Sequence, residues 1–269
     1  MRALSAVLLA SVGCSFVGGP GSGVDARVAP DGSPLADAAA DGAVDAAQLT
    51  LCGDENPLLG GCWEFENNLL DSTANDNDGT AFNDPMFAAG FAGNALDITG
   101  NDAVLIGESL SLDSSAITVE ARINVDDYPA PTQEGVIFDN QSQYALLIVD
   151  DDGKLGCVAA SGPPITSLSG LVPLDAWVHV GCVVDSTRIR MFFDGDEIMC
   201  ATRVNPVQTG GDVGSAMGTD LNAGGTPTGG FFDGLIDSLR VFEGARTAAE
   251  MCAAAGKSGC TELDVTQCT

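Results

Sequence analysis

Basic residues are scarce in this chain. Its 269 residues include 10 lysines and arginines against 38 aspartates and glutamates, so the formal net charge is −28. Nucleic-acid phosphates and anionic lipid headgroups both bind through clustered lysine and arginine, which excludes them as direct electrostatic partners. An acidic surface attracts cations, or it only keeps a surface protein soluble, and the composition leaves both interpretations open.

Histidine occurs once, at His179, and no C-x-x-C pair is present. Zinc sites are built from sets of cysteine and histidine, so a zinc site is excluded. His179 lies beside Trp177 in an apolar run, where we expect it to pack rather than to catalyse. No nucleophile–base pair and no Gly-x-Ser-x-Gly elbow stands out. We therefore expect a protein that is not an enzyme.

The N-terminal apolar run is too short to cross a bilayer, which takes about 20 residues. Residues 1–13 carry one basic residue near the start, Arg2, and end with small residues, as a signal peptide does. The following Ser11-Val12-Gly13-Cys14 resembles the lipobox of bacterial lipoproteins, although Ser11 replaces the usual leucine. The resemblance implies that Cys14 is lipidated and anchors the protein to the bacterial outer membrane or cell surface. Simple secretion is the alternative.

Aromatic residues are missing between Phe16 and the start of the folded domain near Leu51. Residues 14–50 are an Ala/Asp/Gly-rich tract that buries too little apolar surface to offset the entropy of ordering. We interpret them as a disordered tether. Residues 51–269 form the predicted domain, with a short cysteine-containing extension at its C-terminus.

Cysteine is abundant, with nine residues. Without Cys14 the number is even, as disulfides require, and disulfides indicate an exported protein. Connectivity cannot be derived from spacing alone. We favour one pair between neighbouring strands and two pairs that close short terminal loops: Cys157–Cys182 (with Cys182–Cys200 as the rival), Cys52–Cys62 and Cys260–Cys268. Cys252, and whichever of Cys157, Cys182 and Cys200 stays unpaired, are left without an obvious mate.

Alternating apolar and polar residues predict many short strands. The clearest is the hairpin over 177–195, in which two apolar runs flank a polar turn at Asp185–Thr187. Another is the unbroken alternation over 117–125. The single helical segment is 247–255, where Thr247 suits the N-cap and Gly256 the stop. This pattern predicts an all-β fold, a two-sheet antiparallel sandwich with a short C-terminal helix.

Several motifs between residues 60 and 255 resemble laminin G-like, concanavalin A-like jelly-roll domains. They are Cys62-Trp63-Glu64-Phe65, Asp71-Ser72, Gly93-Asn94-Ala95-Leu96, Thr118-Val119-Glu120-Ala121-Arg122, Trp177-Val178-His179-Val180, Phe193-Asp194-Gly195 and Gly234–Phe242. The resemblance implies a jelly roll whose first and last strands are adjacent. Most members of this family bind glycans or proteins, often with calcium, and lack catalysis, although a shared fold does not settle function.

The resemblance also implies a structural calcium ion between the first strand region and the last strand. The matching positions are Glu66 or Asp71 at the start and Asp237 at the end. In a regular strand Asp237 shares a face with Leu235 and Leu239, where an ionised carboxylate needs a partner. Calcium accepts such oxygen ligands. Backbone N–H groups at the strand end are the alternative partner.

Two further sets of polar residues bear on ligand binding and on catalysis. Asp139, Asn140, Asp220 and Asn222 lie in or beside predicted loops and are candidates for a ligand-binding rim, with ordinary solvated loops as the alternative. Glycosidases with this fold carry Glu-x-Asp-x-x-Glu or Glu-x-Asp-x-Glu on one strand. The nearest match here, 120–123, has Arg122 in place of the aspartate.

The sequence thus predicts an exported, lipid-anchored surface protein whose laminin G-like domain binds a glycan or an extracellular protein, with structural calcium. The alternatives are an adhesion protein of the envelope without a discrete pocket, or a jelly-roll glycoside hydrolase. The oligomeric state is not predicted.

Overall fold

The computed structural model describes residues 52, 56–141, 143–159, 165–203, 207, 209 and 213–268. All of them belong to the compact unit Asp45–Thr269. The predicted signal peptide, the predicted lipidation site Cys14 and the predicted tether lie outside these residues. In the part of the chain that the structure describes, no helix is long and apolar enough to cross a membrane.

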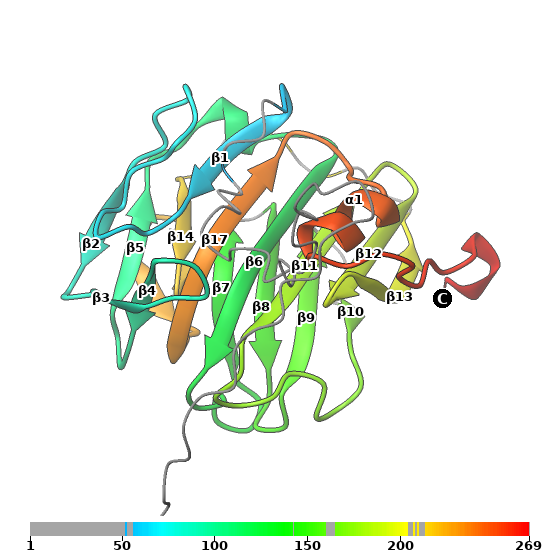
Figure 1. Ribbon diagram of the computed structural model, residues 1–269. Helices are drawn as coiled ribbons and strands as arrows, with labels where there is room; N and C mark the ends of the chain where they lie inside the picture. The colour runs from blue at the N-terminus through cyan, green and yellow to red at the C-terminus, as the bar shows by residue number, and fades with distance from the viewer. Residues whose placement is uncertain are drawn as a thin grey trace, which may run out of the picture. The chain divides into compact units, whose positions relative to one another are not determined.

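Two antiparallel sheets packed face to face form the domain (Figure 1). The eight-stranded sheet runs in the order β13 (Asp196–Thr202), β12 (Arg188–Phe193), β11 (Val178–Val184), β6 (Ile117–Val125), β17 (Gly234–Phe242), β4 (Asn94–Ile98) and β3 (Met86–Ala89), and β1 (Leu59–Trp63) also pairs with β17. The seven-stranded sheet runs in the order β10 (Ile165–Thr166), β9 (Lys154–Ala159), β8 (Tyr144–Val149), β7 (Glu134–Asn140), β14 (Ser215–Met217), β5 (Ala103–Ile106) and β2 (Gly79–Phe82). A small hairpin pairs β15 (Asp220–Leu221) with β16 (Pro227–Gly229).

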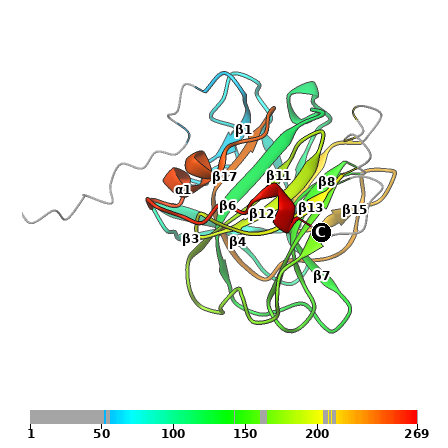
Figure 2. The same cartoon turned by 90° about the vertical axis from the view of Figure 1, so that its right-hand side faces the viewer.

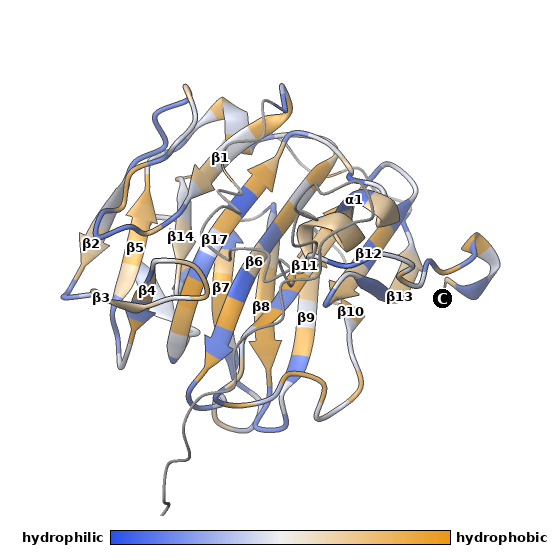
Figure 3. Cartoon of the chain, in the orientation of Figure 1, coloured by the Kyte–Doolittle hydropathy of each residue, from blue (hydrophilic) through white to orange (hydrophobic). Residues whose placement is uncertain are grey.

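The strand alternation explains which side chains form the core. On β6, Val119, Ala121 and Ile123 belong to the buried cluster between the sheets. Glu120 and Arg122 alternate with them and therefore point outward. Figure 3 shows the same alternation of apolar and polar bands along β6 and β17. The predicted all-β jelly-roll sandwich is confirmed, and the first strand, β1, lies beside the last, β17.

The predicted C-terminal helix is also present, as α1 (Ala248–Ala254). It begins with a capping box in which the Thr247 side chain accepts from the Glu250 amide and the Glu250 side chain accepts from the Thr247 amide. Gly256 follows with φ +74°, the left-handed conformation that suits glycine after a helix. Short 3₁₀ helices, η3 (Leu110–Leu112) and η4 (Val265–Gln267), complete the described elements.

Strand β17 contains a bulge that the sequence pattern does not reveal. Its register against β6 shifts between Asp237 and Arg240, and Ser238 has φ +51°. The extra residue reverses the alternation. Asp237 is therefore on the outer face with Arg240, while Leu239 is in the core. The expectation that Asp237 and Leu239 share a face is wrong for this reason.

Four disulfides join the eight described cysteines. Two are the expected pairs, Cys52–Cys62 and Cys157–Cys182, and the second links β9 of one sheet to β11 of the other. The expected Cys260–Cys268 pair is wrong, because Cys260 bonds to Cys252 and Cys268 bonds to Cys200. Both of these bonds fasten the C-terminal segment, one to α1 and one to β13. The Cys157–Cys182 pair is therefore confirmed, but its premise is wrong, because β9 and β11 are not neighbouring strands and face each other across the sandwich. Short spacing at the chain end did not predict a pair.

Helix α1 covers part of the outer face of the eight-stranded sheet. Figure 2 shows it on the opposite side of that sheet from β7 and β8. Met251 packs with Val183 and Phe192 of β11 and β12. The C-terminal segment follows, and the Thr261 carbonyl accepts a hydrogen bond from the Glu197 amide on β13. The two sheets therefore differ in how their outer faces are covered.

Candidate functional site

The outer face of the seven-stranded sheet carries the small hairpin of β15 and β16. Ala145, Leu147 and Val136 form a cluster separate from the main core, so they mark the side of the sheet that faces away from the sandwich. Asp139 pairs in register with Ala145 and therefore shares this side. The Leu221 amide on β15 donates to Asp139 Oδ2 at 3.4 Å, which places the hairpin over β7. Figure 2 shows β15 on this side of the molecule.

An open hollow of about 560 Å³ lies where this hairpin meets the start of β7. Its walls combine hydrogen-bonding side chains, two apolar rings and glycine backbone: Thr132, Gln133, Glu134, Asp220, Pro129, Phe231, Gly100, Gly229 and Gly230. Gly230 holds one wall in place, because its carbonyl accepts from the Val136 amide at 2.8 Å. Its φ of +62° and the 3.0 Å between an added Cβ and Val136 Cγ2 both favour glycine there. The walls are thus mainly polar, with two apolar rings among the hydrogen-bonding groups.

Asp139 is the most unusual group near this hollow. Only 7% of its surface is exposed, and its one hydrogen bond given above is long. Burial, together with the nearby charges of Asp220 and Glu134, raises its pKa from 3.8 to about 7, and the Leu221 amide opposes the rise only in part. A carboxyl group that titrates near neutrality is common at functional sites.

The two other carboxylates of this group line the hollow itself. Glu134 and Asp220 are exposed. Partial burial raises the pKa of both, and the charge of Asp220 adds to the effect on Glu134. None of the ion pairs formed by described residues involves Asp139 or these two. Among the described residues, the negative charge of the hollow therefore has no neutralising side chain.

The four predicted rim residues are placed differently from one another. Asp139 and Asp220 lie together as described. Asn140 is 1% exposed and donates to the Leu112 carbonyl at 2.9 Å, so it supports the sandwich interior. Asn222 is exposed, and its Oδ1 accepts from the Gly224 and Thr226 amides, which organises the turn between β15 and β16. Only Asp220 of the four lines the hollow.

Sequence reasoning missed the other residues of the hollow. Phe231 and Gly230 follow β16, and Thr132–Glu134 lead into β7, so no short motif joins them. The glycine pair Gly229–Gly230 before Phe231 was the available signal, because glycine with positive φ permits a close approach of backbone to a neighbouring strand. That signal indicates a tight contact but not a ligand.

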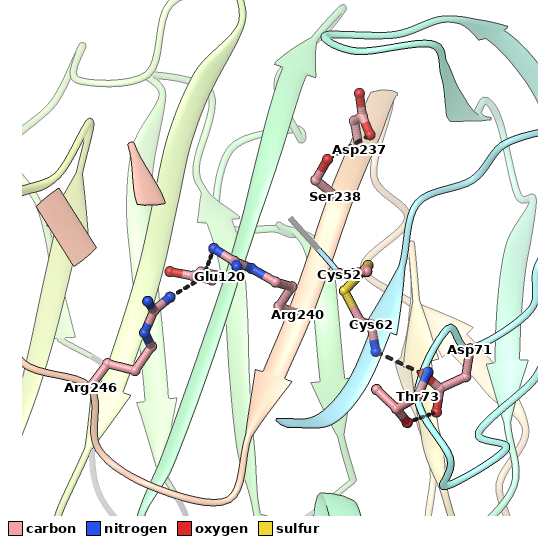
Figure 4. Close-up of a disulfide and its surroundings, with 9 residues drawn as sticks. All are labelled: Cys52, Cys62, Asp71, Thr73, Glu120, Asp237, Ser238, Arg240 and Arg246. Atoms are coloured by element: carbon pink, nitrogen blue, oxygen red, sulfur yellow. Dashed lines mark hydrogen bonds and ion pairs between the residues drawn. A yellow bond between two sulfur atoms is a disulfide. The ribbon is translucent and has the colours of Figure 1, made fainter. Parts of the chain in front are cut away.

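The predicted calcium ligand Asp71 is fully occupied by protein donors. Its Oδ1 accepts from the amides of Cys62 at 2.9 Å and Thr73 at 3.0 Å. Its Oδ2 accepts from Thr73 Oγ1 at 2.8 Å and the Asn77 amide at 3.0 Å. Figure 4 shows Asp71 in the loop after β1, apart from Asp237 on β17. Asp71 thus ties this loop to the first strand.

The other two predicted ligands hold a different loop. Asp237 is 1% exposed and accepts from the Ala92 amide and from Ser238 Oγ, each at 3.0 Å, and burial raises its pKa. Glu66 accepts from the amide and side chain of Asn94, each at 3.2 Å. The described residues include no group of three His, Cys, Asp or Glu side chains that suits a metal ion. These three carboxylates therefore do not fit one shared calcium ion, and calcium stays a prediction.

Glu120, in the segment that comes nearest to a glycosidase motif, lies on the other sheet and is buried in an ionic cluster. It is 1% exposed and pairs with Arg240 and, at 2.6 Å, with Arg246 (Figure 4). Burial alone would raise its pKa, but Arg240, His179 and Arg246 outweigh burial and hold the pKa at about 2. An acid catalyst needs a proton near neutral pH, and this carboxylate has none.

His179 belongs to the same cluster, as its predicted packing role requires. It is 2% exposed, and its Nε2 lies 3.4 Å from Glu120 Oε2. Burial lowers its pKa, and Glu120 offsets only part of that effect. It lies on the face of the eight-stranded sheet that α1 partly covers, and it does not line the hollow beside β7.

Comparison with solved structures finds the same architecture in domains of other proteins. Domain 4 of AbnA, a GH43 extracellular arabinanase from Geobacillus stearothermophilus solved in complex with arabinotriose, is similar with a TM-score of 0.59 and 24% identity, over 73% of this chain and 98% of that domain. The binding domain of Paraclostridial Mosquitocidal Protein 1 has a TM-score of 0.59 at 12% identity, over 73% of this chain and 51% of that one. The binding domain of botulinum neurotoxin serotype G has a TM-score of 0.56 at 11% identity, over 74% and 50%.

At these identities the likeness shows the fold alone, and the chain covers about half of each toxin domain. A search of curated proteins gave no match. The laminin G-like profile of the concanavalin A-like lectin/glucanases superfamily, however, matches residues 99–252. Since that segment is more than half of the chain and contains β6 to β17, the protein belongs to the laminin G-like group of the concanavalin A-like lectin/glucanases superfamily.

Proposed function

We propose that this protein is a non-enzymatic surface protein whose laminin G-like domain binds a glycan, free or attached to another protein, in the hollow between the β15–β16 hairpin and the start of β7. The observation that carries the proposal is the composition of the hollow. Glu134, Asp220 and Gln133 offer acceptors to sugar hydroxyl groups, and the Phe231 ring offers an apolar face to a sugar ring.

The comparisons support this proposal at the level of fold. The similar arabinanase domain was solved with arabinotriose, and the similar toxin domains are binding domains. The proposal also includes export and attachment through lipid on Cys14, for which the N-terminal sequence is the support. The four disulfides are consistent with an oxidising compartment.

A glycan array followed by titration of the best ligand tests the binding site. Asp220→Asn and Phe231→Ala are expected to weaken binding by roughly tenfold each, because each removes one contact of about 1–2 kcal/mol. Two matched controls lie on the other sheet or beyond it. Phe91→Ala removes a half-exposed ring that stacks on Arg122, and Glu243→Gln changes an exposed carboxylate after β17.

Each result bears on a different alternative. Equal affinity in all four variants places the ligand elsewhere. An array without any specific binder favours the adhesion protein without a discrete pocket. Cleavage of a bound oligosaccharide contradicts the non-enzyme proposal.

Calcium and the lipid anchor need separate measurements. The melting temperature in EDTA and in excess calcium tests the structural ion, and a rise with calcium supports it. Cys14→Ser followed by membrane fractionation tests the anchor. Unchanged association with the membrane refutes lipidation.

A further inference from the structure

The β15–β16 hairpin (residues 220–229) is attached to the sheet at few points near its first strand. Besides the Asp139 contact, Gln141 Nε2 donates to the Leu221 carbonyl at 2.5 Å. At its other end, Gly230 is held by Val136 and Phe232 by Gly218. The hairpin supplies Asp220 and Gly229 to the hollow, so its position decides the shape of one wall.

The side chains packed around Asp139 supply almost no favourable charge. The neighbouring strands β8 and β14 place Ala145 and Ala216 opposite it, and neither can titrate. The hairpin brings Asp220, and Glu134 lies at the start of the same strand, β7. The Leu221 amide is the one described donor to its carboxylate. An ionised Asp139 thus faces two like charges and one long hydrogen bond.

We propose that Asp139 makes the hollow pH-sensitive: when this carboxyl group ionises, the β15–β16 hairpin loosens and the wall that it forms opens. This inference rests on the proposed function only where it takes the hollow to be a ligand-binding site; the pH effect on the hairpin does not depend on it. Loosening hydrates the carboxylate and separates it from Asp220, and both changes favour the charged form.

The direction of the effect follows from linkage. The pKa of Asp139 is about 7 in the closed hairpin and returns toward 3.8 when the group is hydrated. The closed form therefore binds the proton more tightly than the open form. The closed hairpin is most stable below pH 3.8, loses stability as the pH rises toward 7, and changes no further above that.

Hydrogen exchange of the Leu221 amide, measured at pH 5 and pH 8 and corrected for the intrinsic rate, tests the proposal without any ligand. We expect its protection to fall by at least about tenfold at the higher pH, since each pKa unit is worth a factor of ten. Asp139→Asn keeps an acceptor for the amide but cannot ionise, so its protection is expected to be equal at both pH values. Asp151→Asn, in an exposed turn, is the matched control and should behave as the wild type does.

Two outcomes overturn the proposal. One is equal protection of Leu221 at both pH values in the wild type. The other is the same fall in Asp139→Asn. If Asp139→Asn does not fold, Asp220→Asn replaces it. That variant should move the midpoint of the fall in Leu221 protection to lower pH. An unchanged midpoint contradicts the proposal. The glycan array and this experiment fail independently, because the exchange measurement contains no glycan.

Discussion

The two outer faces of the sandwich treat buried carboxylates in opposite ways. On the eight-stranded sheet, Glu120 is surrounded by Arg240, Arg246 and His179 under the C-terminal part of the chain, and its pKa is held at about 2. On the seven-stranded sheet, the charged groups that act on Asp139 in the described part of the chain are the like charges of Asp220 and Glu134, and its pKa rises to about 7. Both groups are more than nine-tenths buried. The two carboxylates differ in the charges of their neighbours. Glu120 belongs to an ionic cluster that stabilises the fold, whereas Asp139 belongs to a group whose charge changes with pH near neutrality.

The largest expected effect breaks the ionic cluster around Glu120. Glu120→Gln removes the carboxylate that Arg240 and Arg246 share, which should lower the free energy of unfolding by about 3–5 kcal/mol because buried guanidinium groups lose their counter-charge. Since the pKa of Glu120 is lowered, the loss is complete above pH 4.5 and diminishes as the pH falls toward 2. Urea denaturation measures it. Glu243→Gln, which changes an exposed carboxylate, should stay within about 0.5 kcal/mol of the wild type, and equal losses in the two variants would contradict the assignment.

A second prediction concerns the two disulfides that fasten the C-terminal segment, which includes α1. The Cys200–Cys268 bond closes 68 residues and the Cys252–Cys260 bond closes 8. On loop entropy, replacing the first pair by serine should cost about 4 kcal/mol and replacing the second about 2.5 kcal/mol. Thermal unfolding of the two double variants checks the order. The reverse order would mean that the short Cys252–Cys260 bond contributes more to the stability of the C-terminal segment than the Cys200–Cys268 bond does.

The face that carries Asp139 is tested by a change that should stabilise the protein. Asp139→Asn removes a carboxylate that is buried among like charges, so at pH 8 the variant should be more stable than the wild type by about 1–3 kcal/mol. The raised pKa means that the advantage disappears as the pH falls toward 3.8. Urea denaturation at pH 4, 6 and 8 measures the difference, with Asp151→Asn as control. A variant less stable than the wild type at pH 8 would contradict the comparison between the two faces.

Features of the fold and of the site could be predicted from sequence where their cause lies in nearby residues. Period-two alternation predicted the strands at 117–125 and 178–184, because each side chain reports its own face. The bulge at Ser238 escaped, since one extra residue with positive φ leaves no clear mark in an apolar strand. The burial of Asp139 escaped as well, because Leu221 lies 82 residues further along the chain. Asn140, next to Asp139, was assigned to the rim although its side chain points into the interior.

The smallest expected effect sharpens the comparison within the acidic face. Burial is the largest cause of the raised pKa of Asp139, and the negative charge of Asp220 is the second. Asp220→Asn should therefore lower the titration midpoint of Asp139 by about half a pH unit. Carboxyl-carbon NMR of the variant measures it. An unchanged midpoint would leave burial and the charge of Glu134 as the causes of the raised pKa.

The most direct test of the central claim is the same NMR titration of the wild-type protein, followed for Glu120 and Asp139 together. The arrangement of charges predicts that Asp139 titrates near pH 7 while Glu120 stays ionised down to about pH 2. An Asp139 midpoint near its ordinary value of 3.8, or a Glu120 midpoint above 4.5, would contradict the account.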